Sequence, residues 1–222
     1  MKIISTIDED HHLHSFNFSD GMNTIDTIVE MAPSFGLKKI TITDHSQALL
    51  DHFNYARKCS RSVAIKRWEN IYNDIVVNFG VEADLLDENG TICDHIQGKS
   101  SDGIILAAHK EIYRGNKDLM TQGYIRAIKQ NHEKIMFIGH LDAKIYAPYV
   151  DVAKVIEVAN NYGIPLEFNC ANHIDDGKID RDNQKILLAK ADKIIVNSDA
   201  HTLNELRDLR KIGYDFLRKM DI

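Results

Sequence analysis

The sequence has few cysteines, few prolines and no excess of positive charge. Its three cysteines, Cys59, Cys93 and Cys170, are scattered and odd in number, which argues against a disulfide framework and is compatible with a reducing cytoplasm. Three prolines and no Gly/Ser-rich tract leave no obvious linker, so we predict that residues 1–222 form a single domain. Twenty-seven basic and 33 acidic residues give a net charge of −6, which lacks the basic signature of a nucleic-acid-binding protein.

Long hydrophobic runs are also missing. The first apolar run, Ile3–Ile7, is far too short for a signal peptide or a membrane span, and no later run is long enough to cross a bilayer. We therefore expect no membrane partner and a cytoplasmic location. Hydrophobic residues make up 44% of the chain, which is ordinary for a globular protein with a real core.

Strand-like and helix-like apolar patterns mostly alternate along the chain. The predicted strands are an opening strand through Asp10–Ser15 and the ranges 39–43, 80–85, 104–108, 135–138, 165–169 and 194–196. The predicted helices are 24–35 with Asn23 as its N-cap, 63–79, 117–131, 150–162, 183–189 and a last helix opened by a capping box at Thr202–Glu205. The segment 46–62 is expected to be irregular.

This alternation predicts parallel strands joined by crossover helices. The strands are also nearly continuous apolar runs, which is typical of strands buried on both faces. Both features indicate an α/β fold with about seven strands, and they favour a barrel over an open sheet.

The stretch Asp10-His11-His12-Leu13-His14 holds three histidines and an acid. On an extended segment His12 and His14 project to the same side, about 7 Å apart, which suits two imidazoles binding one metal ion. A solvated histidine-rich N-terminus or a tag remnant is the alternative interpretation.

Further histidines and acids lie on or directly after the other predicted strands: His45, Glu82, His109, His140, Asp199 and His201. In α/β barrels the functional groups gather at the C-terminal ends of the strands, so these residues are predicted to meet at one mouth. Imidazoles and carboxylates together suit Zn²⁺, Mn²⁺ or Fe²⁺. Each residue taken singly also has a structural interpretation. His109 and His140 can be hydrogen-bonded histidines at the barrel rim, and Glu82 can form a buried ion pair. Asp199 to His201 can cap the following helix. The remaining histidines fall outside this pattern: His11, His52, His95, His132 and His173.

In these motifs the sequence resembles the polymerase-and-histidinol-phosphatase (PHP) family of metal-dependent phosphoesterases. The matching segments are Asp10-x-His12-x-His14-Ser15, Ser19-Asp20-Gly21, Ile42-Thr43-Asp44-His45, Gly80-Val81-Glu82-Ala83, Ala107-Ala108-His109, Ile138-Gly139-His140, Leu166-Glu167-Phe168-Asn169 and Ser198-Asp199-Ala200-His201. They occur in family order over almost the whole chain. The resemblance implies a distorted (β/α)7 barrel with its metal site at the C-terminal ends of the strands.

The resemblance also implies a cluster of two or three divalent ions (Zn, Mn or Fe). The first metal is expected on His12, His14, Glu82 and Asp199. The second is expected on Glu82, His109 and His140, with Glu82 bridging the two. The third is expected on Asp20, His45 and His201, and some family members have histidine where Asp20 stands. Asp10 and Asp44 are expected to orient ligand imidazoles.

Such a cluster can hydrolyse a phosphate ester. The ions bind the phosphate oxygens, and a water bridging two of them loses a proton and attacks phosphorus in line. Glu82, Asp199 and His201 are therefore the predicted catalytic residues, with Asp199 or His201 helping to protonate the leaving alkoxide. Arg181, in the predicted loop after the sixth strand, is a candidate phosphate ligand or a surface arginine. Lys144 and Arg57 are further candidates of the same kind.

The stretch Gly139-His140-Leu141-Asp142-x-Lys144 resembles histidinol-phosphate phosphatases more than the polymerase-associated members, which favours a small phosphorylated metabolite as substrate. The predicted function is therefore histidinol-phosphatase-like hydrolysis of a small phosphate monoester, by a chain that is shorter than many histidinol phosphatases. The alternatives are a phosphodiesterase or exonuclease, a protein-tyrosine phosphatase, and a non-catalytic metal-binding module. Nucleic acid is not the expected partner, and the sequence leaves the oligomeric state open.

Overall fold

The computed structural model describes residues 1–222 except 56–58, 69–73, 102 and 221–222. Its strands are β1 (Lys2–Ile3), β2 (Glu9–Leu13), β3 (Lys39–Ile42), β4 (Val76–Phe79), β5 (Val81–Leu85), β6 (Ile92–Cys93), β7 (His95–Ile96), β8 (Lys99–Ser100), β9 (Ile104–Ala107), β10 (Ile135–Ile138), β11 (Leu166–Asn169) and β12 (Lys193–Asn197). Its α-helices are α1 (Ile25–Met31), α2 (Gln47–Phe53), α3 (Arg61–Trp68), α4 (Met120–Asn131), α5 (Val152–Asn161), α6 (Cys170–His173), α7 (Arg181–Lys190) and α8 (Leu203–Lys219). Short 3₁₀ helices are η1 (Ala32–Phe35), η2 (Lys117–Leu119) and η3 (Lys144–Tyr146).

The strands form two main sheets. The larger sheet has the order β1-β12-β11-β10-β9-β5-β6 and is parallel except for the β5–β6 pair. The smaller sheet has the order β2-β3-β4 and is parallel throughout. All seven strands predicted from the sequence are present, and they run in the same direction wherever they pair.

Two backbone contacts join these sheets into a ring. Leu13, at the end of β2, bridges Ala200 after β12, and the His14 N–H donates to the Ala200 carbonyl at 2.9 Å. On the other side, His45 after β3 bridges Glu82 of β5. The seven parallel strands are therefore arranged in the order β2-β3-β5-β9-β10-β11-β12, with isolated bridges rather than continuous ladders between β12 and β2 and between β3 and β5. This is the distorted α/β barrel that the sequence predicts.

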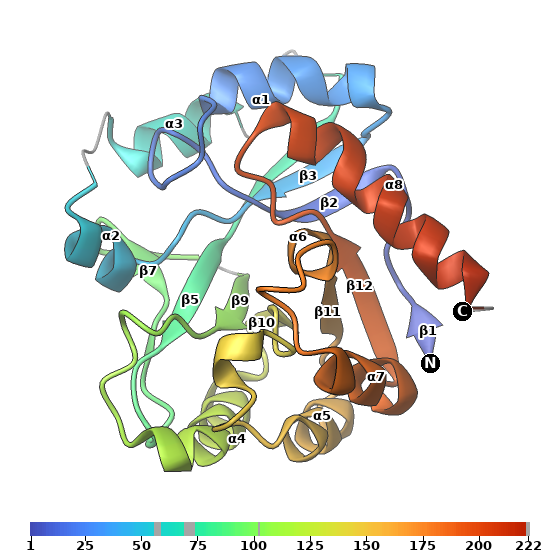
Figure 1. Cartoon of the computed structure of the whole chain (residues 1–222). Helices are drawn as coiled ribbons and strands as arrows, with labels where there is room; N and C mark the ends of the chain where they lie inside the picture. The colour runs from blue at the N-terminus through green and yellow to red at the C-terminus, as the bar shows by residue number, and fades with distance from the viewer. Residues whose placement is uncertain (56–58, 69–73, 102, 221–222) are drawn as a thin grey trace.

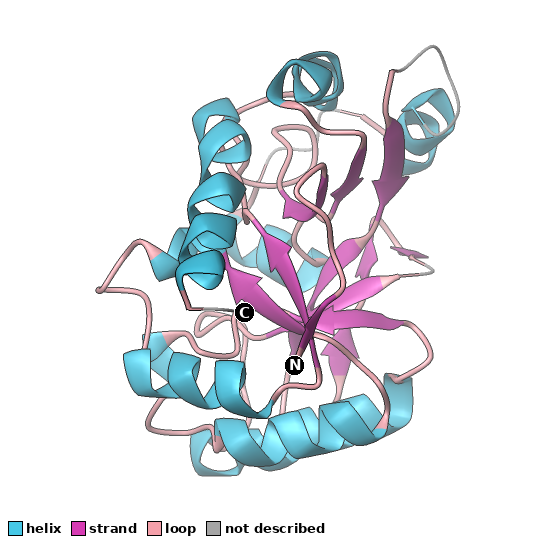
Figure 2. Cartoon of the chain, turned by 90° about the vertical axis from the view of Figure 1, so that its right-hand side faces the viewer, coloured by secondary structure: helices cyan, strands magenta, loops and turns pink. Residues whose placement is uncertain are grey.

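The longer helices lie around the outside of the strands, while the short helix α6, directly after β11, lies near the centre of the view in Figure 1 (Figures 1 and 2). One core packs α4, α5 and α7 on the larger sheet through residues such as Ile128, Ile156 and Leu187, which are at most 1% exposed. A second core packs α1 on the smaller sheet through Ile28 and Ile40. In both views the N-terminal strand β1 lies beside the C-terminal end of α8. Among the described helices, none has the length and apolar character needed to cross a membrane.

The predicted helix over 63–79 is wrong in its second half. Helix α3 ends at Trp68, and Val76–Phe79 is strand β4, paired in parallel with β3. Burial alternates from residue to residue there, with Ile75 and Val77 buried and Val76 and Asn78 exposed. Alternation with a period of two is typical of a strand. The apolar spacing of this segment fits both periods, and pairing with β3 decides between them.

Three smaller predictions also need correction. The segment 46–62 is not irregular throughout, because it contains α2 and the start of α3. Thr24, rather than Asn23, caps α1 by accepting a hydrogen bond from the Thr27 N–H. Arg181 lies in no loop, since it is the first residue of α7. The capping box at Thr202 and Glu205 is confirmed.

Candidate metal centre

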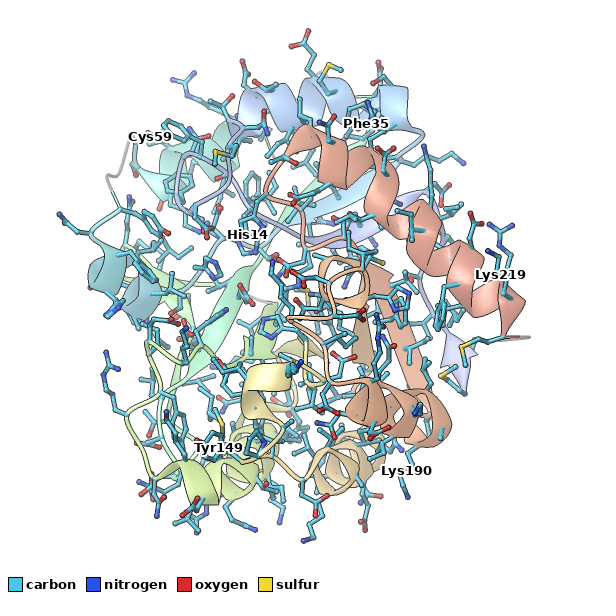
Figure 3. All side chains as sticks on the ribbon, in the orientation of Figure 1. His14, Phe35, Cys59, Tyr149, Lys190 and Lys219 are labelled. Atoms are coloured by element: carbon cyan, nitrogen blue, oxygen red, sulfur yellow. The ribbon has the colours of Figure 1, made fainter. Side chains whose placement is uncertain are left out.

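The nine predicted metal ligands converge at the C-terminal ends of the ring strands. They are supplied by β2 and β5 or by the segments that directly follow β2, β3, β9, β10 and β12. Because parallel strands end at the same side of a barrel, residues 187 positions apart meet there, as His14 and His201 do with their ring centroids 4.3 Å apart. His14 is labelled in this central cluster in Figure 3.

Glu82 lies at the centre of the cluster and is only 1% exposed. Five imidazole nitrogens lie within 2.6 to 3.6 Å of its two carboxylate oxygens, from His12, His14, His45, His109 and His140. The shortest of these distances join His45 Nδ1 to Glu82 Oε2 at 2.6 Å and His140 Nε2 to Glu82 Oε1 at 2.7 Å. One carboxylate thus contacts five histidines from four different stretches of the chain.

The described residues contain three groups whose ligand atoms lie within 4.8 Å of one another. These groups are His12, His14 and Asp199; His45, Glu82 and His109; and His14, Asp20, His45 and His201. The first and third resemble the ligand sets expected from the family. The second pairs Glu82 and His109 with His45, while His140 contacts Glu82 directly.

Three buried atoms in the cluster make no hydrogen bond: His12 Nε2, His45 Nδ1 and Glu82 Oε2. Buried polar atoms are normally hydrogen-bonded, and an unpaired one costs free energy. All three belong to residues whose donor atoms face one another. The donor set of imidazole nitrogens and carboxylate oxygens suits Zn²⁺, Mn²⁺ or Fe²⁺, so these residues fit the expected cations.

Two carboxylates behind the cluster contact imidazoles of the predicted ligands. Glu167 Oε1 lies 2.8 Å from His12 Nδ1, and Asp84 Oδ1 lies 2.6 Å from His109 Nδ1. In each case the other ring nitrogen, Nε2, faces Glu82. Such a contact fixes the tautomer and orientation of a metal-binding imidazole.

The prediction that Asp10 and Asp44 have this orienting role is wrong. Asp10 accepts hydrogen bonds from the Ser198 hydroxyl and N–H, and Asp44 accepts from the Ser15 hydroxyl and N–H. They hold the backbone of the ligand segments rather than the imidazoles. The sequence did contain a signal for Asp84. It follows Glu82 by two residues on the same strand, so the two side chains lie on the same face.

Two of the predicted ligands adopt a left-handed backbone, with φ of 28° at His140 and 56° at Asp199. Residues other than glycine rarely occupy this region. The His140 N–H donates to Glu167 Oε2 at 3.0 Å, and the Asp199 side chain accepts from Asn169 Nδ2 at 3.0 Å. These hydrogen bonds help hold both residues in this conformation, which turns their side chains toward the cluster.

Neighbouring charges shift the pKa values of the residues in the cluster. Burial raises the pKa of Glu82, but the imidazoliums of His109, His45 and His12 outweigh this and hold that pKa well below its ordinary value. Burial lowers the pKa of His201, but its hydrogen bond to Asp20 outweighs this and raises the pKa to about 9.

Burial and the neighbouring positive charges of His201 and His45 lower the pKa of His14 to about 3. His14 is therefore neutral at pH 7. A neutral imidazole is the form that binds a metal ion.

A cavity of about 400 Å³ opens over the cluster. Six predicted ligands line it: His45, Glu82, His109, His140, Asp199 and His201. Two lysines, Lys110 and Lys178, also line it, and the sequence analysis named neither. Lys110 directly follows His109, which is the signal that would have found it.

The predicted substrate-binding residues are placed differently. Arg181 does not line this cavity, and its Nη2 contacts Asp176 Oδ1 at 2.5 Å. Lys144 lines a second, adjoining cavity, and its Nζ donates to the Asp176 carbonyl at 3.3 Å. Arg57 lies outside the described residues.

Relatives of the chain point to phosphoester chemistry. It is 28% identical over 200 residues to a probable phosphatase of Thermoanaerobacter sp. (strain X514), covering 86% of this chain and 78% of the relative. It is 26% identical over 215 residues to the probable phosphatase YcdX of Escherichia fergusonii, covering 91% and 83%. It is also 24% identical over 222 residues to the DNA polymerase/3'-5' exonuclease PolX of Bacillus subtilis, covering 97% of this chain but 38% of that protein.

Two solved structures share the fold. The histidinol phosphate phosphatase of Lactococcus lactis, complexed with zinc, L-histidinol and phosphate, superposes with a TM-score of 0.54 over 94% of both chains at 17% identity. A putative histidinol phosphatase of Listeria monocytogenes superposes with a TM-score of 0.56 over 94% of this chain and 99% of its own, at 14% identity. The PHP domain family model matches residues 10–200. The chain therefore belongs to the PHP domain family.

Proposed function

We propose that this protein is a metal-dependent phosphatase that hydrolyses a small phosphate monoester in the cavity above Glu82. It is a phosphoric ester hydrolase of the PHP family. The observation that carries the proposal is the convergence of five imidazoles on the buried Glu82 carboxylate at the floor of that cavity. Nearby carboxylates complete a donor set for several cations.

The ligand assignment follows the geometry and the family pattern. His12, His14 and Asp199 would hold one ion with Glu82. Glu82, with His109 and His140, would hold a second, and Asp20, His45 and His201 a third. When bound, two or three such ions would neutralise the phosphate oxygens and lower the pKa of water, so that it loses a proton and hydroxide is available to attack phosphorus.

The chain's own residues position the substrate and move protons. Hydrolysis forms a bond from the water oxygen to phosphorus and breaks the bond to the leaving oxygen, which takes up a proton. Asp199 and His201 both line the cavity, so either can relay that proton. Asn169 holds Asp199 by a 3.0 Å hydrogen bond, which keeps the carboxylate aimed at the cluster.

The phosphate contacts come from cations at the cavity. Lys110 and Lys178 line it and are exposed enough to reach a bound ester. Arg181 does not line the cavity and is paired with Asp176, so we assign it a smaller part in phosphate binding than its sequence position suggested. A cavity of about 400 Å³ suits a small metabolite. The free thiols Cys59, Cys93 and Cys170 are compatible with work in the cytoplasm.

The test is phosphate release from a panel of sugar, amino-alcohol and aryl phosphates, with the protein stripped by chelator and reloaded with Zn²⁺, Mn²⁺ or Fe²⁺. We expect turnover that chelation abolishes and a metal restores. A single-stranded oligonucleotide and a phosphotyrosine peptide belong in the same panel. If the oligonucleotide or the peptide is hydrolysed faster than every small monoester, that substrate class replaces the small monoester in the proposed function.

The control variant is His132→Ala, because His132 is an exposed histidine at the end of α4, outside the cluster. It should keep wild-type metal content and rate. A fully metal-loaded wild type that releases no phosphate from any ester would overturn the proposed function.

A further inference from the structure

A second cavity, of about 300 Å³, adjoins the cavity over the metal centre. The two share three lining residues, Lys110, Ile145 and Tyr146. Tyr146 is buried and its hydroxyl donates to the Ala108 carbonyl at 2.7 Å, so this part of the shared wall is fixed. The second cavity therefore lies directly beside the cavity over the metal centre, along the wall that these residues form.

Three lysines line the second cavity: Lys110, Lys117 and Lys144. Its other described lining residues are tyrosines and apolar side chains, with no carboxylate among them: Tyr113, Met120, Ile145, Tyr146, Pro148 and Tyr149. The positive charge of this lining contrasts with the net charge of −6 of the whole chain. Like-charged walls in a concave, partly apolar pocket concentrate ligands of the opposite charge.

The lysines are only partly neutralised by neighbours. Lys110 Nζ lies 3.4 Å from Glu111, whose side chain lines the first cavity and not the second. Lys144 Nζ donates to the Asp176 backbone carbonyl, which carries no net charge. Lys117 Nζ lies over the ring of Tyr149, 5.6 Å from its centre. Figure 3 labels Tyr149 near η3, well away from His14 at the metal cluster.

We infer that the leaving group of the substrate carries a second anionic group, a carboxylate or a phosphate, which binds among Lys110, Lys117 and Lys144. This inference rests on the proposed function, because it places the reacting phosphate at the metal cluster. It sets this protein's substrate apart from L-histidinol phosphate, whose leaving group is an amino alcohol that carries positive charge at neutral pH.

The test uses matched phosphate monoesters of linear alcohols, HO–(CH₂)n–X, of increasing length. The far group X is carboxylate, phosphate, methyl or ammonium. The metal-loaded protein should hydrolyse the best carboxylate or bisphosphate ester with a kcat/KM at least tenfold above the methyl ester, chiefly through KM. The ammonium ester should fall below the methyl ester. Comparison of the carboxylate and bisphosphate arms identifies the anion, and the optimum length reports the span between the two cavities.

The variant Lys117→Gln should lower the anionic-to-methyl ratio of kcat/KM at least threefold, and Lys117→Glu should shift preference toward the ammonium ester. Lys211→Gln, an exposed lysine of α8 outside both cavities, is the matched control and should keep the wild-type ratio. Equal kcat/KM for all four ester classes, or a preference for ammonium, would overturn the inference while leaving the phosphatase intact. If no ester is hydrolysed at all, the proposed function fails together with it.

Binding gives a readout that does not depend on turnover. Calorimetric titration of the metal-free protein with an alkane-1,ω-diol bisphosphate should show saturable binding that Lys117→Glu weakens at least threefold. Binding that is equally strong in Lys117→Glu would count against the lysine pocket.

Discussion

Glu82 and His45 are joined twice, once through the backbone and once through their side chains. The Glu82 N–H donates to the Asp44 carbonyl at 3.1 Å, and the Ser46 N–H donates to the Glu82 carbonyl at 3.0 Å. Their side chains meet with His45 Nδ1 2.6 Å from Glu82 Oε2. The contact that closes the barrel between β3 and β5 is therefore also part of the candidate metal centre.

Replacing the Glu82 carboxylate should lower the metal content of the cluster. Glu82→Gln keeps the shape of the side chain but removes the charge that five imidazoles face. We expect metal content to fall and phosphate release to drop by about 100-fold or more, since both positioning and charge compensation are lost. Elemental analysis and a phosphate-release assay measure this, with exposed Glu157→Gln as control. Retained metal and rate in Glu82→Gln would contradict the bridging role.

Glu167 gives a subtler test, because it contacts the imidazole rather than the expected metal position. Glu167→Gln weakens the 2.8 Å contact to His12 Nδ1. We expect metal affinity to fall by about 10- to 100-fold while the fold persists, because an orienting carboxylate raises ligand basicity. Competition against a chromophoric chelator measures the affinity. An unchanged dissociation constant would show that His12 needs no such partner.

Metal binding should depend on pH with a defined sign. His201 has a pKa of about 9 in the metal-free protein, so it carries a proton at pH 7 that a metal must displace. Affinity should therefore rise with pH up to about 9, by about tenfold per unit for each proton released. Calorimetry in buffers of different ionisation enthalpy counts the protons.

The metal-free fold should show the opposite trend. Because the folded pKa of His201 lies above its ordinary value of 6.5, its stabilising contribution is complete below pH 6.5 and is lost as pH rises through about 9. Denaturant titrations of chelated protein at pH 7 and pH 9 measure this difference. Greater metal-free stability at pH 9 would contradict the assignment of that proton to His201.

The buried pair of Arg210 and Asp10 should matter for stability rather than for chemistry. Arg210 Nε lies 3.0 Å from Asp10 Oδ2, and both side chains are at most 1% exposed. Arg210→Met leaves a buried carboxylate unpaired, so we expect a loss of about 3–5 kcal/mol in the free energy of unfolding. Denaturant titration measures it.

Arg207→Met on the same helix is the matched control, because Arg207 and its partner Asp208 are both exposed. It should change stability by less than about 1 kcal/mol. Adding Asp10→Asn to Arg210→Met should recover part of the loss. If Arg210→Met is no more destabilising than Arg207→Met, the buried pair contributes nothing to the fold.

The sequence by itself determined the seven ring strands and the nine candidate ligands. Short apolar runs and the acids and imidazoles that end them are local features, and parallel strands bring such ends together whatever lies between them. The capping box at Thr202 and Glu205 could also be predicted from the sequence, because it is a local feature formed by residues three positions apart.

Only the tertiary structure decided the rest. Val76–Phe79 fits helix and strand periodicity alike, and its pairing with β3 makes it a strand. Asp84 and Glu167, not Asp10 and Asp44, orient the imidazoles, because orientation depends on which side chains face each other across the barrel. The pairing of Arg181 with Asp176, and the meeting of Lys110, Lys117 and Lys144 at one cavity, likewise depend on contacts between segments that no local pattern encodes.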